Sequence, residues 1–503
     1  MAAFESLNWL SRFIDETPGD SQIGGTSRQV PGACWSLVNP AIPPNPEMRL
    51  WSEEMGEILG LEKSDGKILG GAEIVEGMKP YSQRYGGHQF GNWAHQLGDG
   101  RAITLGEVDL SDEVLELQLK GSGATPYSRF SDGKAVLRSS IREFLCSEAM
   151  FHLGVPTTRA LSLVTTGEMV VRDMLYDGNP APEIGAIVCR VAPSFIRFGS
   201  FQIHTADGNY ETLGKLLQHT LKNHFPEHQT DTDEGRIEWL TYVAEQTAVM
   251  ISHWMRVGFV HGVMNTDNMS IHGITIDYGP YGWLEGYDPN WTPNTTDAST
   301  LRYRFGHQPR IALWNIARLL EAISPLVGDR SMLQEKINDA QEKMALSHEK
   351  MWVNKLGLKQ YDEELVLELV ELMYQDKVDM TMFFRLLSSL SKPELHQLEP
   401  AFYDIHASNH HDWNIWLKKY LSNTYDENRA KMNLINPKYV LRNWMAQLAI
   451  DDAEKEDYAK IELFTNLLKD PYGENHDFEK DWFRRRPEWA LNRPGCSMLS
   501  CSS

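Results

Sequence analysis

The sequence predicts an α+β fold with two lobes, in which strands gather in the first half of the chain and helices fill the second. Two observations predict this fold. Between residues 101 and 191 several short segments alternate apolar and polar residues with the period of a strand. Beyond about Gly208, long segments carry apolar residues at every third or fourth position, which is the period of an amphipathic helix. Because the strands are grouped instead of alternating with helices, the pattern does not favour a doubly wound parallel sheet.

The first strands are expected as a hairpin. Residues 101–105 and 115–120 alternate at strand period, and an acidic turn at residues 109–113 joins them. Further strands are expected at residues 161–165, 169–172 and 186–191.

One helix is expected among these strands, with a cap at residues 131–133 and an end at Gly154 and Pro156. Four apolar residues would share its buried face: Leu137, Ile141, Phe144 and Leu145. In the second half, residues 237–255 predict a long amphipathic helix that ends at Gly258.

These elements divide the chain into four expected parts. Four prolines within residues 39–46 cannot continue a helix or a central strand, so they close an N-terminal arm and linker at residues 1–46. We expect an N-lobe at residues 47–207, a mostly helical C-lobe at residues 208–473, and a C-terminal tail at residues 474–503 that ends with Cys501 close to the last residue. A chain of 503 residues is longer than one ordinary core requires.

Composition and charge exclude several classes of protein. With 42% hydrophobic and 23% charged residues, the chain lacks the composition of a disordered protein. Its 48 basic and 69 acidic residues give a net charge of −21, which argues against nucleic acid as a partner, so any phosphate must be held locally. Five scattered cysteines make no disulfide scaffold, and neither a signal peptide nor a membrane-spanning run occurs. We therefore expect a cytoplasmic protein.

The strongest local signal is the segment His261-Gly-Val-Met-Asn-Thr-Asp-Asn268, followed nine residues later by Asp277-Tyr278-Gly279. Protein kinases place a His-Arg-Asp motif with a later Asn, and then Asp-Phe-Gly, after a long helix with the same spacing. An amide oxygen and a carboxylate from two turns are hard oxygen ligands that suit Mg²⁺, so Asn268 and Asp277 are candidate metal ligands. The alternative is a capped turn followed by an ordinary Gly-Pro turn.

A kinase-like site also requires an ion pair between a strand lysine and a helix glutamate. Lys120 ends a predicted strand, and Glu143 lies on the helix that follows. One position breaks the pattern, because the slot of the kinase catalytic aspartate holds Val263, which cannot accept a proton. Asp267 is the nearest replacement carboxylate, although it could equally cap the loop backbone. Ordinary phosphotransfer is therefore in doubt.

Phosphate-binding residues are expected at two further places. Gly98-Asp-Gly100-Arg101 precedes a strand and could offer backbone N–H groups and a guanidinium, although such a turn alone is a weak signal. Arg190 and Arg197 flank Pro193 in a chain that is otherwise acidic, which suggests a local anionic partner or, alternatively, two surface arginines. The role of the aromatic segment around Trp93, with His88 and His95, stays open at this stage, and a packed turn is expected there.

Five long motifs together resemble the selenoprotein O family. They are YSQRYGGHQFGNWAHQLGDGRA, ELQLKGSGATPYSRFSDGKAVLRSSIREF, CRVAPSFIRFGSF, HGVMNTDNMSIHGITIDYGPYGW and RYRFGHQPRIALWNIARL. The resemblance runs from about Trp35 to Pro494. It implies a two-lobed protein-kinase-like fold with an enlarged N-lobe that transfers AMP from ATP to Ser, Thr or Tyr hydroxyls of proteins, with ATP bound in a flipped orientation.

The resemblance also implies roles for single residues. A Gly-rich turn and a lysine bind the nucleotide in this family, which corresponds here to Gly98, Gly100, Arg101 and Lys120, with Glu143 as the partner of the lysine. An Asp-Gly pair in a second loop corresponds to Asp132 and Gly133, and two phosphate-binding arginines correspond to Arg190 and Arg197. The proton acceptor of the family corresponds to Asp267, and Mg²⁺ (or Mn²⁺) would lie at Asn268 and Asp277.

Several alternatives stay open. An atypical protein kinase and a non-catalytic, redox-linked nucleotide-binding switch are the other functions to weigh, and UMP transfer from UTP with Mn²⁺ is compatible with the motifs. Family members with selenocysteine carry it near the C-terminus, where this chain has Cys501. Three states are open for Cys501: a disulfide bond with Cys496, no disulfide bond, or a solvent-exposed thiol without a function. We expect protein acceptors, no membrane partner, and a monomer.

Overall fold

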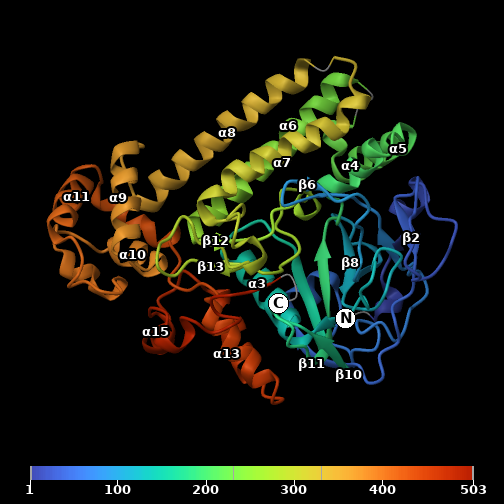
Figure 1. The fold of residues 1–503 in the computed structure, drawn as a ribbon, viewed down its shortest axis with the longest axis horizontal. Coiled ribbons are helices and arrows are strands. Elements are labelled where there is room, and N and C mark those ends of the chain that lie inside the picture. Colours follow the sequence, from blue (N-terminus) through green and yellow to red (C-terminus); the bar gives the residue numbers. More distant parts are fainter. Residues whose placement is uncertain (1–2, 230–231, 330, 501–503) are drawn as a thin grey trace.

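The first half of the chain forms one large antiparallel sheet, and the second half is helical (Figure 1). The structure is a computed structural model and describes residues 3–229, 232–329 and 331–500. The predicted order, with strands first and helices second, is confirmed. The last described residues return to the neighbourhood of the sheet, where the Ser500 hydroxyl donates to the carbonyl of Met174, just after β10.

Within the described residues the main sheet has nine strands, in the order β2-β4-β7-β8-β11-β10-β3, while β1 pairs with β7 and β9 pairs with β11. Their bounds are β1 (Trp9–Leu10), β2 (Trp35–Leu37), β3 (Glu47–Trp51), β4 (Tyr81–Gln83), β7 (Ala102–Asp109), β8 (Val114–Lys120), β9 (Ala135–Val136), β10 (Arg159–Arg172) and β11 (Ala181–Ala192). The predicted hairpin is therefore formed by β7 and β8, whereas the strands expected at residues 161–165 and 169–172 are parts of one strand, β10, with a register shift between Thr165 and Met169. Two strands from the expected N-terminal arm, β1 and β2, also join this sheet.

Side chains alternate across the sheet as the period of two requires. On β8, Leu117 and Leu119 pack into an apolar cluster with residues of α2 (Glu53–Leu59). The intervening Gln118 and the strand's last residue, Lys120, therefore point to the opposite face. On the neighbouring β11, Arg190 is the register partner of Gln118 and shares that face. The alternation thus aligns polar groups from two adjacent strands.

Helix α3 (Leu137–His152) crosses this polar face of the sheet and packs on β10 and β11. Its four predicted core residues, which begin with Leu137, are all buried. The expected cap at residues 131–133 is wrong, because β9 comes between that loop and the helix and Val136 is the N-cap residue without a side-chain cap. The Asp132 carboxylate instead accepts the Lys134 N–H.

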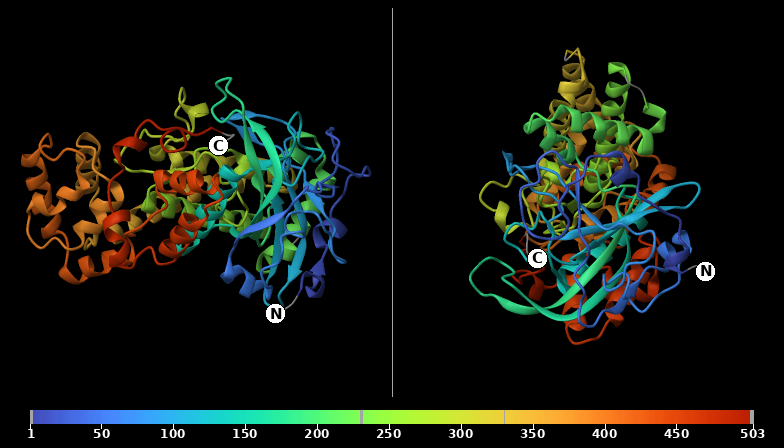
Figure 2. Two further views of the ribbon diagram at one scale, coloured as in Figure 1. Left: turned by 90° about the horizontal axis from the view of Figure 1, so that it is seen from below. Right: turned by 90° about the vertical axis from the view of Figure 1, so that its right-hand side faces the viewer.

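The helices of the second half surround two further apolar clusters. Their bounds are α4 (Phe198–Ala206), α5 (Tyr210–His224), α6 (Asp233–Val257), α7 (Gln308–Ile323), α8 (Ser331–Leu356), α9 (Glu363–Gln375), α10 (Met380–Leu387), α11 (His410–Ser422), α12 (Asp426–Lys431), α13 (Asn443–Ala453), α14 (Ala459–Lys469) and α15 (His476–Trp482), after the short α1 (Arg12–Glu16). Helices α9 to α11 lie at the end of the molecule away from the sheet (Figure 2), whereas α13 and α14 return to pack on α3.

The predicted long helix, α6, ends where the sequence indicates. Gly258 follows it with φ of 77°, and its N–H donates to the Trp254 carbonyl.

A Cβ at Gly258 would lie 3.0 Å from Met380 Sδ and would force an L-residue into the left-handed region. We therefore expect Gly258→Ala to lower the free energy of unfolding by about 1–2 kcal/mol, as measured by urea unfolding. Gly214→Ala, in open space within α5, is the control and should leave stability unchanged or raise it; equal losses in the two variants would contradict this account.

Four cysteines, Cys34, Cys146, Cys189 and Cys496, are buried free thiols, whereas Cys501 lies outside the described residues. Burial raises the pKa of Cys496 to about 12, which makes this thiol a poor nucleophile. The described part of the tail is held in place up to its end, where the Leu499 N–H donates to the Pro293 carbonyl over 2.9 Å. Across the described ranges, none of the helices combines the length and the apolar character needed to cross a membrane.

Candidate active site

Two short strands hold the loop that carries the strongest sequence motif. β12 (Phe259–Val260) and β13 (Gly282–Trp283) pair in antiparallel fashion and fix both ends of the loop. Inside it, His261 Nε2 lies 2.9 Å from the Ile276 carbonyl oxygen, which ties the loop's first arm to its second. The loop is thereby folded back on itself, and its second arm meets side chains from the polar face of the sheet through Asp277.

Asp277 is the centre of the site, because three cations from other elements reach its carboxylate. Arg190 donates to Oδ1, Arg197 Nη1 lies 2.6 Å from Oδ2, and Lys120 Nζ lies 3.7 Å from Oδ1. Burial would raise the pKa of Asp277, but Arg190, Arg197 and Lys120 hold it well below its ordinary value. Asp277 also has a φ of 57°, a left-handed conformation that is uncommon outside glycine. The carboxylate is therefore ionised and fixed in direction.

Lys120 and Glu143 form an ion pair that joins β8 to α3. Lys120 Nζ lies 2.6 Å from Glu143 Oε2, and the other oxygen of Glu143 lies 3.2 Å from Arg190 Nη1. Both members of the pair are buried. The pKa of Lys120 is lowered, because the effect of burial outweighs the opposite effect of the Glu143 and Asp277 carboxylates. The structure therefore places strand lysine, helix glutamate and loop aspartate in one connected network.

The two arginines are core residues and not surface residues. Arg190 is 2% exposed and Arg197 is 0% exposed. Arg190 donates to the Gln118 side-chain oxygen, and Arg197 Nη1 also donates to the Asp267 carbonyl over 2.9 Å. Burying two guanidinium groups is costly unless carboxylates compensate them, and here Asp277 and Glu143 supply that compensation.

Two partners of these arginines were missed from the sequence. Gln118 lies two residues before Lys120, so strand periodicity alone would have placed it on the same face. Asp99 lies between the two expected glycines, Gly98 and Gly100. Its Oδ1 is 3.7 Å from Arg197 Nη2, and burial raises the pKa of Asp99. No sequence signal paired it with an arginine 98 positions later in the chain.

Asp267 lies in a short 3-10 turn, η3 (Thr266–Asn268), and is 7% exposed. Gln89 Nε2 donates to its Oδ2 over 3.4 Å, while its buried Oδ1 has no hydrogen-bond partner among the described residues. Burial raises the pKa of Asp267 to about 6. A Cβ at Gly87 would collide with Oδ1, so glycine is what allows the backbone to cover this carboxylate.

Asn268 and Val263 occupy neighbouring places in the same loop. The Asn268 amide nitrogen donates to the Val263 carbonyl over 2.9 Å, which fixes the amide plane. The amide oxygen accepts no hydrogen bond from the described part of the chain. Val263 is buried. An apolar side chain thus occupies the place where the kinase pattern has its catalytic carboxylate.

The remaining expected residues fall into two groups. Arg101 lines a small cavity of about 10 Å³ together with Lys120 and Glu143, which is room for roughly one water molecule. Gly98 and Gly100 pack against Tyr127, where side chains would clash. Asp132 and Gly133 lie on a separate loop, and the exposed Asp132 pairs with Arg172 over 2.6 Å instead of reaching the central network.

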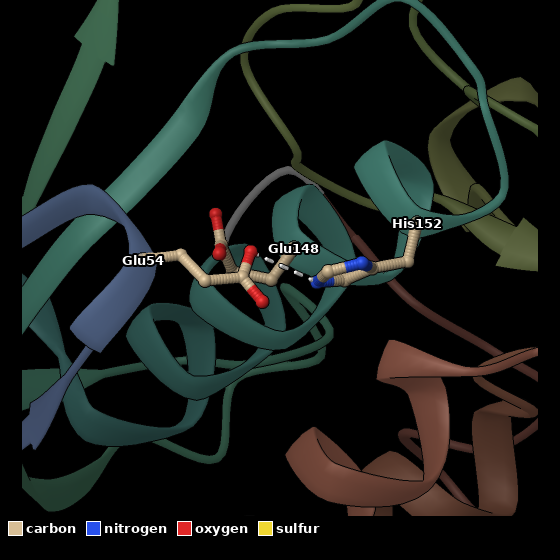
Figure 3. Close-up of side chains that lie close together, drawn as sticks. All are labelled: Glu54, Glu148 and His152. Carbon is tan, nitrogen blue, oxygen red and sulfur yellow. Dashed lines mark ion pairs between the residues drawn. The ribbon is translucent and has the colours of Figure 1, made fainter. Parts of the chain in front are cut away.

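Figure 3 shows a second group of side chains of the type that binds metals, formed by Glu54 of α2 with Glu148 and His152 of α3. His152 Nε2 lies 3.5 Å from Glu54 Oε2. However, Arg159 donates two hydrogen bonds of 2.8 Å to the two oxygens of Glu148 and lies 3.2 Å from Glu54. The guanidinium already compensates these carboxylates, so the group is a structural ion-pair cluster.

Comparisons with known proteins identify the family of this chain. The model of the family described as protein adenylyltransferase SelO matches residues 27–470. The chain is 50% identical to the protein nucleotidyltransferase YdiU of Flavobacterium johnsoniae, over 99% of this chain and all of that protein. It is 51% identical to the YdiU protein of Azoarcus sp. over 98% of this chain and 99% of that one, and 50% identical to the one from Tolumonas auensis. The chain therefore belongs to the SelO family of protein adenylyltransferases and is a nucleotidyltransferase.

Proposed function

We propose that this protein transfers AMP from ATP to Ser, Thr or Tyr hydroxyl groups of other proteins, in a cleft between a sheet-containing N-lobe (47–207) and a helical C-lobe (208–473) of kinase-like architecture. The observation that carries the proposal is the convergence of Lys120, Arg190 and Arg197 on Asp277. Kinases need only the lysine at this place. Two additional buried arginines suit a phosphate that points inward.

The arginines account for the proposed direction of the nucleotide. A γ-phosphate that points into the protein needs its charge neutralised there, and guanidinium groups bind phosphate oxygens in pairs. Arg190 and Arg197 would supply these guanidinium groups, deeper in the protein than Lys120. The rest of the nucleotide would contact the two loops that hold Gly98, Gly100, Arg101, Asp132 and Gly133. The α-phosphorus is then left on the side of the acceptor. Pyrophosphate becomes the leaving group, and Lys120, Arg190 and Arg197 would stabilise the negative charge that develops on it.

Asp267 is the proposed proton acceptor. Its carboxylate lies on the loop beside Asn268, and one of its oxygens is free of hydrogen-bond partners among the described residues. A carboxyl with a raised pKa is a stronger base than an ordinary aspartate. It would take the proton of the acceptor hydroxyl as that oxygen attacks the α-phosphorus.

The donor set of Asn268 and Asp277 fits Mg²⁺ or Mn²⁺, since both offer hard oxygen atoms and the Asn268 oxygen is not engaged elsewhere. The metal, when bound, would neutralise phosphate charge. The chain's own contribution is to fix the two ligands, through the Val263 carbonyl for Asn268 and through the arginines for Asp277. We place the reaction in the cytoplasm, where the free thiols stay reduced.

The proposal is tested by supplying ATP labelled at either the α- or the γ-phosphate, with Mg²⁺ or Mn²⁺ and a protein extract. We expect transfer of the α-label only, and a parallel reaction with labelled UTP reports any UMP transfer. Asp267→Asn, which keeps the side-chain shape, is the matched control and should remove the signal. Transfer of the γ-label alone would establish a protein kinase instead, and transfer of neither label by the unaltered protein would favour the non-catalytic switch.

A further inference from the structure

A positively charged surface lies beside Asp267, where the hairpin of β5 (His88–Gln89) and β6 (Asn92–Trp93) meets the beginning of α7. We call it the basic surface, and it consists of Arg302, Arg304, Arg310 and Arg318. Burial lowers the pKa of His307, and the nearby charges of Arg304 and Arg310 lower it further. Burial also lowers the pKa of His88, together with Arg318 and Arg302. The four guanidinium groups therefore act on one neighbourhood.

Most of this positive charge is not compensated. Among the residues that the structure describes, Arg318 has a carboxylate partner, Glu321 at 2.5 Å, whereas Arg302, Arg304 and Arg310 have no carboxylate within 4.0 Å. Arg310 is exposed, and Arg302 and Arg304 are half-buried. In a chain with a net charge of −21, three neighbouring unpaired arginines are a local reversal of the overall charge.

The basic surface is tied directly to the loop of Asp267. The His88 N–H donates to Thr266 Oγ1 over 2.7 Å, and Gln89 contacts Asp267 itself. From the α7 side, the hydroxyl of Tyr303, the neighbour of Arg302, donates to Asn265 Oδ1 over 2.6 Å. The surface is therefore connected to residues one and two positions from Asp267.

Aromatic rings hold two of these arginines, Arg302 and Arg318, in position. The guanidinium carbons of Arg302 and Arg318 lie 4.8 and 5.0 Å from the centre of the Trp314 ring, and His88 packs between Trp314 and Trp93. Cation–π packing orders the arginine side chains without neutralising them. The aromatic segment whose role the sequence left open thus supports the basic surface.

We propose that the basic surface docks acceptor proteins through acidic residues that flank the hydroxyl to be modified. The inference rests on the proposed function, because it takes Asp267 as the group that faces the acceptor. Arginine binds carboxylates through paired hydrogen bonds, and opposite charges steer a partner toward its site. With a net charge of −21, the protein as a whole repels an acidic segment, so a basic surface beside Asp267 favours approach to that place.

Single-stranded nucleic acid also binds surfaces that combine arginine with aromatic rings. A long polyanion would, however, extend beyond the basic surface onto a protein with 69 acidic residues and meet repulsion there. A short acidic protein segment fits the limited extent of the surface better.

Binding is tested with the full-length protein and fluorescent peptides in which phenylalanine replaces the acceptor residue, so that no transfer occurs. Flanking residues are glutamate, alanine or lysine, and anisotropy is read at low and at physiological salt. We expect the glutamate peptide to bind about tenfold more tightly than the alanine peptide at low salt, and salt to weaken it. Equal affinities, no binding of the glutamate peptide, or tighter binding of a single-stranded oligonucleotide would overturn the proposal.

The double variant Arg304→Glu with Arg310→Glu should weaken binding of the glutamate peptide at least tenfold and improve that of the lysine peptide. Arg484→Glu, at an exposed arginine next to Trp444, is the matched control and should change neither. An unchanged thermal shift with ATP verifies that each variant is folded. If no α-label is transferred but binding still depends on the flanking charge, the proposed function is wrong and the docking proposal is supported. If α-label is transferred at the same rate whatever the flanking charge, the docking proposal is wrong.

Discussion

Replacement of Asp277 by alanine will lower AMP transfer by on the order of a thousandfold or more, because the change removes both a proposed metal ligand and the group that aligns the cations proposed to bind phosphate. Arg197 Nη1 lies 2.6 Å from this carboxylate, Arg190 also donates to it, and Lys120 is close by. Without it, two buried guanidinium groups lose their main counter-charge. Label transfer from α-labelled ATP measures the loss.

The alanine variant will also be less stable, since removal of one partner from a buried ion-pair network costs about 3–5 kcal/mol when the remaining charge is left uncompensated. Asp277→Asn separates the two effects. Its amide oxygen can still accept a hydrogen bond from Arg197, so we expect more of the stability to remain while transfer is still lost. Transfer by Asp277→Asn at the rate of the unaltered protein would remove Asp277 from the active site.

The second large effect is expected for Lys120→Ala. Lys120 Nζ lies 2.6 Å from Glu143 and joins α3 to the sheet at the place where phosphate would bind. Loss of this cation removes charge stabilisation from the leaving group and frees Glu143 to hold Arg190 more strongly, so we expect transfer to fall by roughly a hundredfold to a thousandfold. Rates measured over a range of ATP concentrations separate weaker nucleotide binding from a slower reaction.

Lys215→Ala is the control for Lys120→Ala, because within the described residues this exposed lysine of α5 pairs only with Glu211, over 2.7 Å on the same helix. Exposed pairs of this kind contribute little, so neither activity nor folding should change by a measurable amount. If the Lys120 and Lys215 variants lost the same small fraction of activity, the ion pair with Glu143 would have no part in the reaction.

Much of the fold follows from local pattern. The alternation at residues 115–120 predicts β8, and the helical period at residues 237–255 predicts α6 together with its end at Gly258. The expected cap at residues 131–133 failed because two residues of β9 pair with β11 ahead of the helix, and that pairing depends on residues about fifty positions away. Strands as short as β1 carry too little pattern to be recognised, since only their partner in the sheet makes them strands.

The site was predictable to a different degree. Motif spacing singled out Lys120, Glu143 and Asp277, and the structure brings these three together. What the sequence could not give is the convergence of Arg190 and Arg197 on Asp277, because residues 80 or more positions apart meet there only through the packing of β11, α4 and the loop. The unpaired arginines beside Asp267 were equally hidden, since charge compensation depends on which neighbours folding supplies.

The most direct measurement is a crystal structure of the protein with a non-hydrolysable ATP analogue and Mg²⁺. We expect the γ-phosphate to lie inside, bound by Arg190 and Arg197, with the metal on Asn268 and Asp277 and the α-phosphorus open toward Asp267. A γ-phosphate that points out toward the acceptor side, with both arginines still paired to Asp277 as they are here, would contradict it.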